Sequence, residues 1–244
     1  MRLSVDADAE RFVETKLPPS GLVRVLAAEA GEQRFEIRAP AHVVSADVIQ
    51  AERGFRGDAD EQRTLDLEYL ELESETYDVV LCINVLEHVH HPLDVFPIVR
   101  QSLTEGGLFV LMLPNVSSVK GMVTRLTPAR FHRWFYARIL KSPPGHAPVA
   151  SVHSFSLRPS SLLGQARAGG WTLEYFRLYE GPTQMALRTR IGLVGWRWRI
   201  VTALTRSISF GTLTARDTGI VAVLSKPADG VRVSPAARPG RTRG

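Results

Sequence analysis

The segment that most constrains the fold runs from Tyr77 to Pro92 and has the sequence YDVVLCINVLEHVHHP. Its first part, Tyr77 to Ile83, is a short run rich in valine and leucine, which is typical of a central parallel strand covered on both faces. Ligands of open α/β sheets bind outside the carboxyl ends of the strands, so we expect a binding site where this strand ends. An ordinary polar loop at a helix start is the alternative. The polar residues that follow the strand are Asn84, Glu87, His88, His90 and His91.

Two segments together resemble the class I S-adenosylmethionine-dependent methyltransferases. The stretch DVV…VLEHV is similar to the fourth strand of that family, and LTEGGLFVLMLPN, from Leu103 to Asn115, is similar to its glycine turn and fifth strand. The resemblance is best between Leu22 and Pro114. It implies a doubly wound α/β fold with a seven-stranded, mostly parallel, Rossmann-like sheet whose last strand is antiparallel. It also implies that the chain is an enzyme with S-adenosylmethionine as its cofactor.

The length of 244 residues fits one such domain with insertions. We predict a single methyltransferase domain over residues 1–227, with a lid insertion at 115–151 and an amphipathic insertion at 181–216. Residues 228–244 are rich in proline and arginine and carry few apolar side chains. They are predicted to form a disordered basic tail.

The glycine-rich turn after the first predicted strand departs from the family pattern V-L-D-x-G-x-G. Ala27 stands where the family has an acidic residue, Glu29 replaces the first glycine, and only Gly31 matches. The short spacing to the next strand leaves no room for a long helix. The resemblance implies that Glu29, Ala30 and Gly31 contact the cofactor. Because the motif is degenerate, a catalytically inactive methyltransferase-like binding module is the alternative function.

Other cofactor contacts follow from the resemblance. Asp47 ends the second predicted strand, where a carboxylate can accept hydrogen bonds from both ribose hydroxyls. A helix cap is the alternative role for Asp47. The resemblance also places Val48 and Asn84 at the cofactor, and Asp66 and Leu67 at its adenine ring.

Methyl transfer requires an acceptor held in line with the methyl group and, for a hydroxyl acceptor, removal of a proton. His88 is the candidate base because its reference pKa is near neutral, and Glu87 could orient it. The alternative is that His88 only shapes the cofactor pocket. The chain has no second histidine pair or additional cysteine to complete a zinc site with His88, His90 and His91, so we expect no metal.

The predicted lid is basic and aromatic and follows the fifth strand, where it would cover the active-site edge. We expect Arg130, His132, Arg133 and His153 to bind the acceptor, which we predict to be a hydroxyl group on a glycan, a glycolipid, a lipid-linked saccharide or another small molecule. The aromatic residues could instead pack the lid onto the domain. A nucleic-acid methyltransferase is a weaker alternative, because Leu113, Pro114 and Asn115 stand in place of an N-P-P-Y motif.

Residues 181–216 are too many for a structureless connection between two strands. Apolar residues recur there at helical spacing while arginines lie off the apolar stripe, which is typical of an interfacial amphipathic helix. A core-packing helix or a dimer contact would show the same pattern. The predicted stripe consists of Leu187, Ile191, Val194, Trp198, Val201 and Ile208, with Trp196 at its flank.

Charge and cysteine content suggest a location. Basic side chains outnumber acidic ones after residue 180, which suggests an anionic partner such as a membrane surface, a phosphorylated lipid or nucleic acid. A solvated face together with a disordered arginine-rich tail is the alternative. The single cysteine, Cys82, lies in a predicted buried strand, and the first residues lack a signal-peptide core. We therefore expect a cytoplasmic protein that can associate peripherally with the inner face of the membrane.

Overall fold

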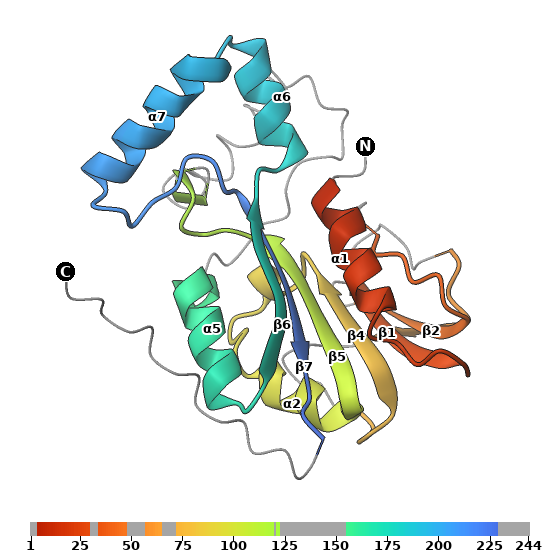
Figure 1. Cartoon of the computed structure of the whole chain (residues 1–244). Helices are drawn as coiled ribbons and strands as arrows, with labels where there is room; N and C mark the ends of the chain where they lie inside the picture. Colours follow the sequence, from red (N-terminus) through yellow and green to blue (C-terminus); the bar gives the residue numbers. More distant parts are fainter. Residues whose placement is uncertain are drawn as a thin grey trace, which may run out of the picture.

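The computed structural model of the chain describes residues 4–29, 34–47, 57–64, 72–119, 121, 122 and 155–228. Within these residues seven strands form one sheet in the order β3-β2-β1-β4-β5-β7-β6 (Figure 1). All neighbouring pairs are parallel except those of β7, which runs antiparallel to both β5 and β6. The predicted fold class is confirmed. The strands are β1 (Val23–Glu29), β2 (Ala41–Asp47), β3 (Glu61–Thr64), β4 (Tyr77–Ile83), β5 (Leu103–Pro114), β6 (Thr172–Tyr179) and β7 (Gly219–Ser225).

The strand predicted from the apolar run is β4, with the predicted bounds, and it lies between β1 and β5. Val79, Leu81 and Ile83 on one face are fully buried, and Val80 and Cys82 on the other face are nearly so. A strand covered on both faces needs apolar residues at every position, which explains why the sequence shows a continuous run.

Helices cover the two faces of the sheet unequally. On one face lie α2 (Val95–Ser102) and α5 (Pro159–Ala168), where the rings of Phe96, Phe109 and Trp171 pack with centroids 5.4–6.4 Å apart. On the other face lies α1 (Ser4–Glu14), which buries Ala9 and Val13 (Figure 1).

The connection from β1 to β2 is short, and its described part, residues 34–40, contains no helix, as its length predicted. These residues lie on the α1 face of the sheet, where Phe35 is 1% exposed. Two carboxylates of α1 accept hydrogen bonds from this segment, Glu10 from the N–H of Glu36 at 3.0 Å and Glu14 from the N–H of Arg38. The segment therefore takes the place of a crossover helix on this face of the sheet.

The amphipathic insertion forms two helices rather than the single helix that the stripe predicted. They are α6 (Pro182–Arg190) and α7 (Gly195–Ile208) (Figure 1). Gly192 and Gly195 between and at the start of these helices have φ angles of 71° and 57°, which break the helical path. The predicted stripe is also divided, because Trp198 and Val201 are half-buried while Ile208 is 77% exposed.

Both helices lie at the end of the sheet where β5 and β6 end (Figure 1). The Arg188 guanidinium fixes this pair of helices, because it donates to both carboxylate oxygens of Glu180, at 2.6 and 3.1 Å, and lies 5.3 Å from the Trp198 ring. Among the described residues, no helix has the length and apolar character needed to cross a membrane. Most of the predicted lid and the predicted tail, residues 123–150 and 229–244, lie outside the described residues.

Candidate functional site

The order of the strands reverses between β1 and β4, and the carboxyl ends of β2, β1 and β4 meet at this switch point. Glu29 at the end of β1 pairs with Ile83 of β4, and Ala28 pairs with Ala46, next to Asp47. The sequence therefore placed Glu29, Asp47 and Asn84 correctly at one edge of the sheet. In doubly wound sheets this crevice is where nucleotide-like ligands bind.

The turn that leaves β4 is fixed by Asn84. This residue has a φ of 54°, in the left-handed region that asparagine tolerates better than most residues. Its N–H donates to the carbonyl of Met112 at 2.7 Å, which ties the turn to β5. A short 3₁₀ turn, η1 (Leu86–His88), follows and brings His88 to the same edge.

Glu29 stabilises the turn that follows β1 at this edge. Its Oε1 accepts a hydrogen bond from the N–H of Phe35 at 2.9 Å, and its Oε2 lies 3.6 Å from Nε of Arg34. The side chain is only 3% exposed. The carboxylate that replaces the family's glycine is therefore used to close the turn, and Arg34 compensates its charge. Whether Glu29 also contacts a cofactor stays a prediction.

Glu87, the predicted orienting partner of His88, is 4% exposed. Burial raises the pKa of the Glu87 carboxyl to about 8, and its Oε2 has no hydrogen-bond partner in the part of the chain that the structure describes. A carboxyl that is largely protonated at pH 7 gives an imidazolium little charge stabilisation. His88 is half-buried, and its role as a base stays a prediction. The described residues hold no group of three or more side chains suited to a metal ion.

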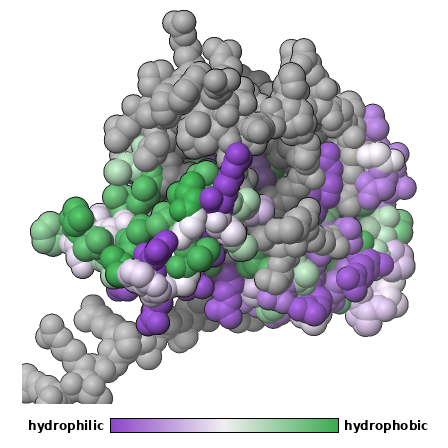
Figure 2. Space-filling model, turned by 90° about the horizontal axis from the view of Figure 1, so that it is seen from above, coloured by the Kyte–Doolittle hydropathy of each residue, from purple (hydrophilic) through white to green (hydrophobic). Residues whose placement is uncertain are grey.

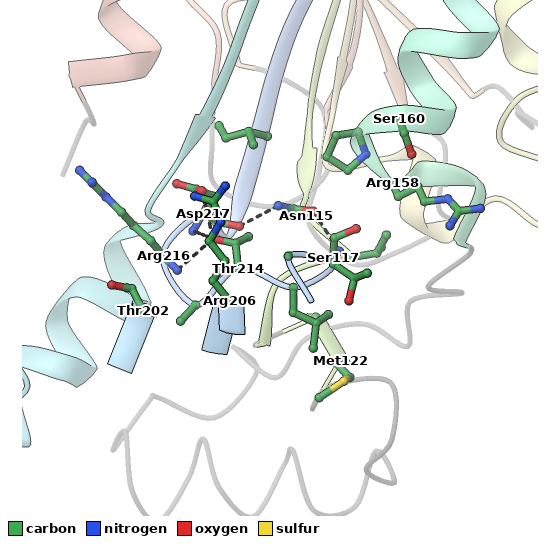
Figure 3. Close-up of a pocket in the computed structure, with 18 of the residues that line it drawn as sticks. Asn115, Ser117, Met122, Arg158, Ser160, Thr202, Arg206, Thr214, Arg216 and Asp217 are labelled. Carbon is green, nitrogen blue, oxygen red and sulfur yellow. Dashed lines mark hydrogen bonds between the residues drawn. The ribbon is translucent and has the colours of Figure 1, made fainter. Parts of the chain in front are cut away.

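A cavity of about 1260 Å³ opens beside this edge, beyond the end of β5 (Figure 3). Its described walls come from the loop after β5, the start of α5, the segment 211–217 and α7. Apolar side chains such as Val116, Met122 and Leu213 share the lining with polar ones. The polar lining residues are Asn115, Ser117, Arg158, Ser160, Thr202, Arg206, Thr212, Thr214, Arg216 and Asp217.

Asn115 holds the floor of this cavity together (Figure 3). Its buried side chain donates to the carbonyl of Asp217 at 2.8 Å and accepts from the N–H of Ser117 at 2.9 Å. The Thr214 hydroxyl donates to the Asp217 carboxylate at 3.0 Å. These bonds fix a rigid cavity floor beneath the side chains that face it.

Sequence reasoning did not identify this cavity. The available signal was Asn115, a polar residue directly after a buried strand, in the same relation to β5 as Asn84 is to β4. Other predicted site residues, and the side chain of Asp47, lie outside the described residues. These residues are Ala30, Gly31, Val48, Asp66, Leu67, Arg130, His132, Arg133 and His153.

A family model described as a methyltransferase domain matches residues 20–173, more than half of the chain. The chain belongs to this methyltransferase family. The prediction made from the fourth and fifth strands is thereby confirmed. No match was found among curated proteins.

Solved structures share the fold of this methyltransferase at low identity. An S-adenosylmethionine-dependent methyltransferase from Mesorhizobium loti is 15% identical, with a TM-score of 0.52 over 91% of this chain and 98% of that one. A second, from Methanosarcina mazei, is 13% identical, with a TM-score of 0.51 over 89% and 97%. The [4+2]-cyclase SpnF is 14% identical, with a TM-score of 0.51 over 92% and 82%. These likenesses show the fold, which does not by itself decide the reaction.

The described residues of the methyltransferase fit S-adenosylmethionine, the predicted cofactor. The backbone of Asp47 ends β2 beside β1, the position at which the family resemblance predicts a carboxylate for the ribose hydroxyls. Ala27 and Ala28 at the end of β1 are small and buried, so they leave the backbone close to the crevice. The negative charge of Glu29 is compensated by Arg34 and does not stand free against the cofactor carboxylate.

Proposed function

We propose that this methyltransferase transfers the methyl group of S-adenosylmethionine to a hydroxyl group of a small anionic acceptor that binds in the cavity. The observation that carries the proposal is the position of the cavity, directly beyond the carboxyl end of β5, which neighbours β4 and ends at the same edge of the sheet as the switch point. The cofactor supplies an activated methyl group, and the chain supplies binding, alignment and a proton acceptor.

The lining of the cavity supports an acceptor with a negative charge. Arg158, Arg206 and Arg216 line it, while Asp217 is the single acidic residue of its described lining. Three guanidinium groups outnumber this one carboxylate, so the described lining carries a net positive charge that favours an anionic ligand. A glycolipid, an acidic glycan or another small acid would meet this lining, and the apolar walls would accommodate a hydrophobic portion.

Residue roles follow from position. Asp47 would hold the ribose hydroxyls of the cofactor, and Asn84 would shape the crevice through the fixed turn after β4. His88 would accept the proton of the acceptor hydroxyl. Arg130, His132, Arg133 and His153, from the predicted lid, remain proposed acceptor contacts.

Calorimetry with S-adenosylmethionine tests the cofactor assignment. The Asp47→Ala variant should lose about 1.5–3 kcal/mol of binding free energy, which is typical for hydrogen bonds to a charged group. Asp8→Ala is the matched control, because Asp8 is half-exposed on α1 and forms a local ion pair with Arg11. If the wild-type protein binds no S-adenosylmethionine at millimolar concentration, the proposal of an active methyltransferase is wrong. The alternative, a catalytically inactive binding module, is then favoured.

Methyl transfer from labelled cofactor into acidic glycan and glycolipid fractions tests the acceptor class. Arg206→Ala and Arg216→Ala should raise KM for the acceptor and leave cofactor affinity unchanged. Arg167→Ala, at an exposed position on α5 away from the cavity, should have no effect. Equal losses of cofactor and acceptor binding would show instead that the arginines stabilise the fold.

A further inference from the structure

Helix α7 presents an apolar stripe to the solvent. Trp196, Ile200, Leu204 and Ile208 follow one another at intervals of four, and their exposed fractions are 67, 48, 55 and 77%. None of the residues of α7 is buried. Figure 2 shows hydrophobic green side chains gathered at the left of the molecule, with purple hydrophilic groups among them. We call these four residues the outer stripe.

The outer stripe has a fixed direction, because the opposite face of α7 is held against the domain. Trp198 and Val201 face inward and are half-buried, and Trp198 stacks on Arg188, which is paired with Glu180. Thr202, Ala203 and Arg206 line the cavity on another side of the helix. The exposed apolar side chains are therefore presented by an anchored helix.

The charged side chains of the insertion that carries the outer stripe are all basic. Residues 181–216 contain no aspartate or glutamate. On α7 itself Arg197, Arg199 and Arg206 are all exposed. The arginines of the whole insertion are Arg188, Arg190, Arg197, Arg199, Arg206 and Arg216.

We propose that α7 docks on an anionic lipid surface through the outer stripe. A helix with an apolar face, a tryptophan and flanking arginines suits the boundary between headgroups and acyl chains. The arginines would contact anionic headgroups while Ile200 and Leu204 enter the apolar layer. Trp196, the exposed tryptophan of the outer stripe, would lie near the headgroup level.

A second copy of the chain fits this face less well. A two-fold contact places the same patch of both copies together, so the arginines of one α7 would meet those of the other. Juxtaposed like charges oppose such association. Nucleic acid would satisfy the arginines but would leave the apolar stripe exposed.

Docking through α7 would also bring the cavity close to the lipid surface, because the helix that carries the outer stripe also forms one wall of the cavity. An acceptor that resides in the membrane would then reach the cavity along α7. This last consequence alone rests on the proposed function. Binding to vesicles requires no methyl transfer, so the docking test and the activity test can fail separately.

The test is sedimentation of the full chain with vesicles of phosphatidylcholine, alone or mixed with phosphatidylglycerol. We expect binding to the anionic vesicles at low salt, weaker binding to neutral ones, and loss of binding as salt rises. The Arg197→Gln and Arg199→Gln substitutions should each weaken binding about fivefold, which corresponds to about 1 kcal/mol per basic residue near the surface. Arg167→Gln on α5 is the control.

The apolar contribution is tested with Ile200→Ser combined with Leu204→Ser. Both side chains are exposed in the fold, so the variant should remain folded and lose vesicle binding about tenfold or more. Leu22→Ser is the matched control, since Leu22 is 63% exposed and lies outside the insertion. Circular dichroism of each variant checks that the fold is retained.

Three results would overturn the proposal. The full chain would stay in the supernatant with anionic vesicles at low salt. Alternatively, the Ile200→Ser and Leu204→Ser variant would bind as well as the wild type, which would assign binding to another basic segment. Finally, light scattering would show a dimer that this variant dissociates, which would make the outer stripe a contact between copies.

Discussion

The carboxylate of Glu29, at the end of β1, accepts a hydrogen bond from the backbone N–H of Phe35 at 2.9 Å. With Glu10 and Glu14 from α1, it is one of three carboxylates that receive backbone N–H groups of residues 35–38. An extended segment on a sheet face cannot satisfy its own N–H groups as a helix does. The carboxylates satisfy them instead, so Phe35 can cover the sheet without a crossover helix.

Removing this acceptor should destabilise the protein. Glu29→Ala leaves the buried N–H of Phe35 without its partner, and we expect a loss of about 1–3 kcal/mol in the free energy of unfolding, measured with urea. Glu29→Gln keeps an oxygen acceptor and loses only the charge near Arg34, so it should lose less. Equal losses in the two variants would show that the ion pair with Arg34, rather than the hydrogen bond, is the stabilising contact.

Glu87 should make the stability of the protein depend on pH. Its folded-state pKa is raised from 4.5 to about 8 by burial, so between these values the folded state holds a proton that the unfolded state releases. Stability therefore falls as the pH rises from about 4.5 to 8, since the folded state binds more protons there. Thermal unfolding of Glu87→Gln, which cannot ionise, should show a shallower decline over this range. A wild-type protein as stable at pH 8 as at pH 5 would contradict a raised pKa of the buried Glu87 carboxyl.

Two glycines should respond oppositely to alanine. A Cβ at Gly219 would lie 2.3 Å from the Tyr179 ring, so Gly219→Ala should cost about 1–3 kcal/mol through overpacking. A Cβ at Gly164, within α5, would meet nothing within 4 Å, so Gly164→Ala should stabilise by up to about 1 kcal/mol. Urea unfolding measures both. Combining Gly219→Ala with Tyr179→Leu should recover part of the loss if the ring contact is the cause.

Arg188 should control the attachment of α6 and α7 to the domain. Arg188→Lys cannot reproduce the two-point contact with Glu180, at 2.6 and 3.1 Å, together with stacking on Trp198. We expect faster trypsin cleavage within residues 181–216, with little change in the unfolding of the sheet. Arg199→Lys is the control, because Arg199 is exposed on α7 and trypsin cleaves after lysine as well as after arginine. Equal cleavage in the two variants would show that other contacts hold the helices.

The sequence by itself determined the sheet and the edge at which a bound ligand is expected. The run from Tyr77 to Ile83 predicted β4 because burial on both faces requires an apolar residue at every position, a condition visible in local sequence. Glu29, Asp47 and Asn84 were placed at one edge for a related reason. In a parallel sheet, whatever follows each strand lies at the same edge, so chain order alone brings these residues together.

The tertiary structure decided the features that depend on residues distant in the chain. Glu29 was predicted as a cofactor contact, and its bond to Phe35 depends on how the turn folds back, which no residue pattern specifies. The cavity floor joins Asn115 to Asp217 across 102 positions. The face of α7 that meets solvent was also not predictable, because inward and outward apolar stripes have the same helical periodicity. The packing of Trp198 against Arg188 fixes the orientation of α7 about its own axis. In that orientation Trp196, Ile200 and Leu204 face the solvent.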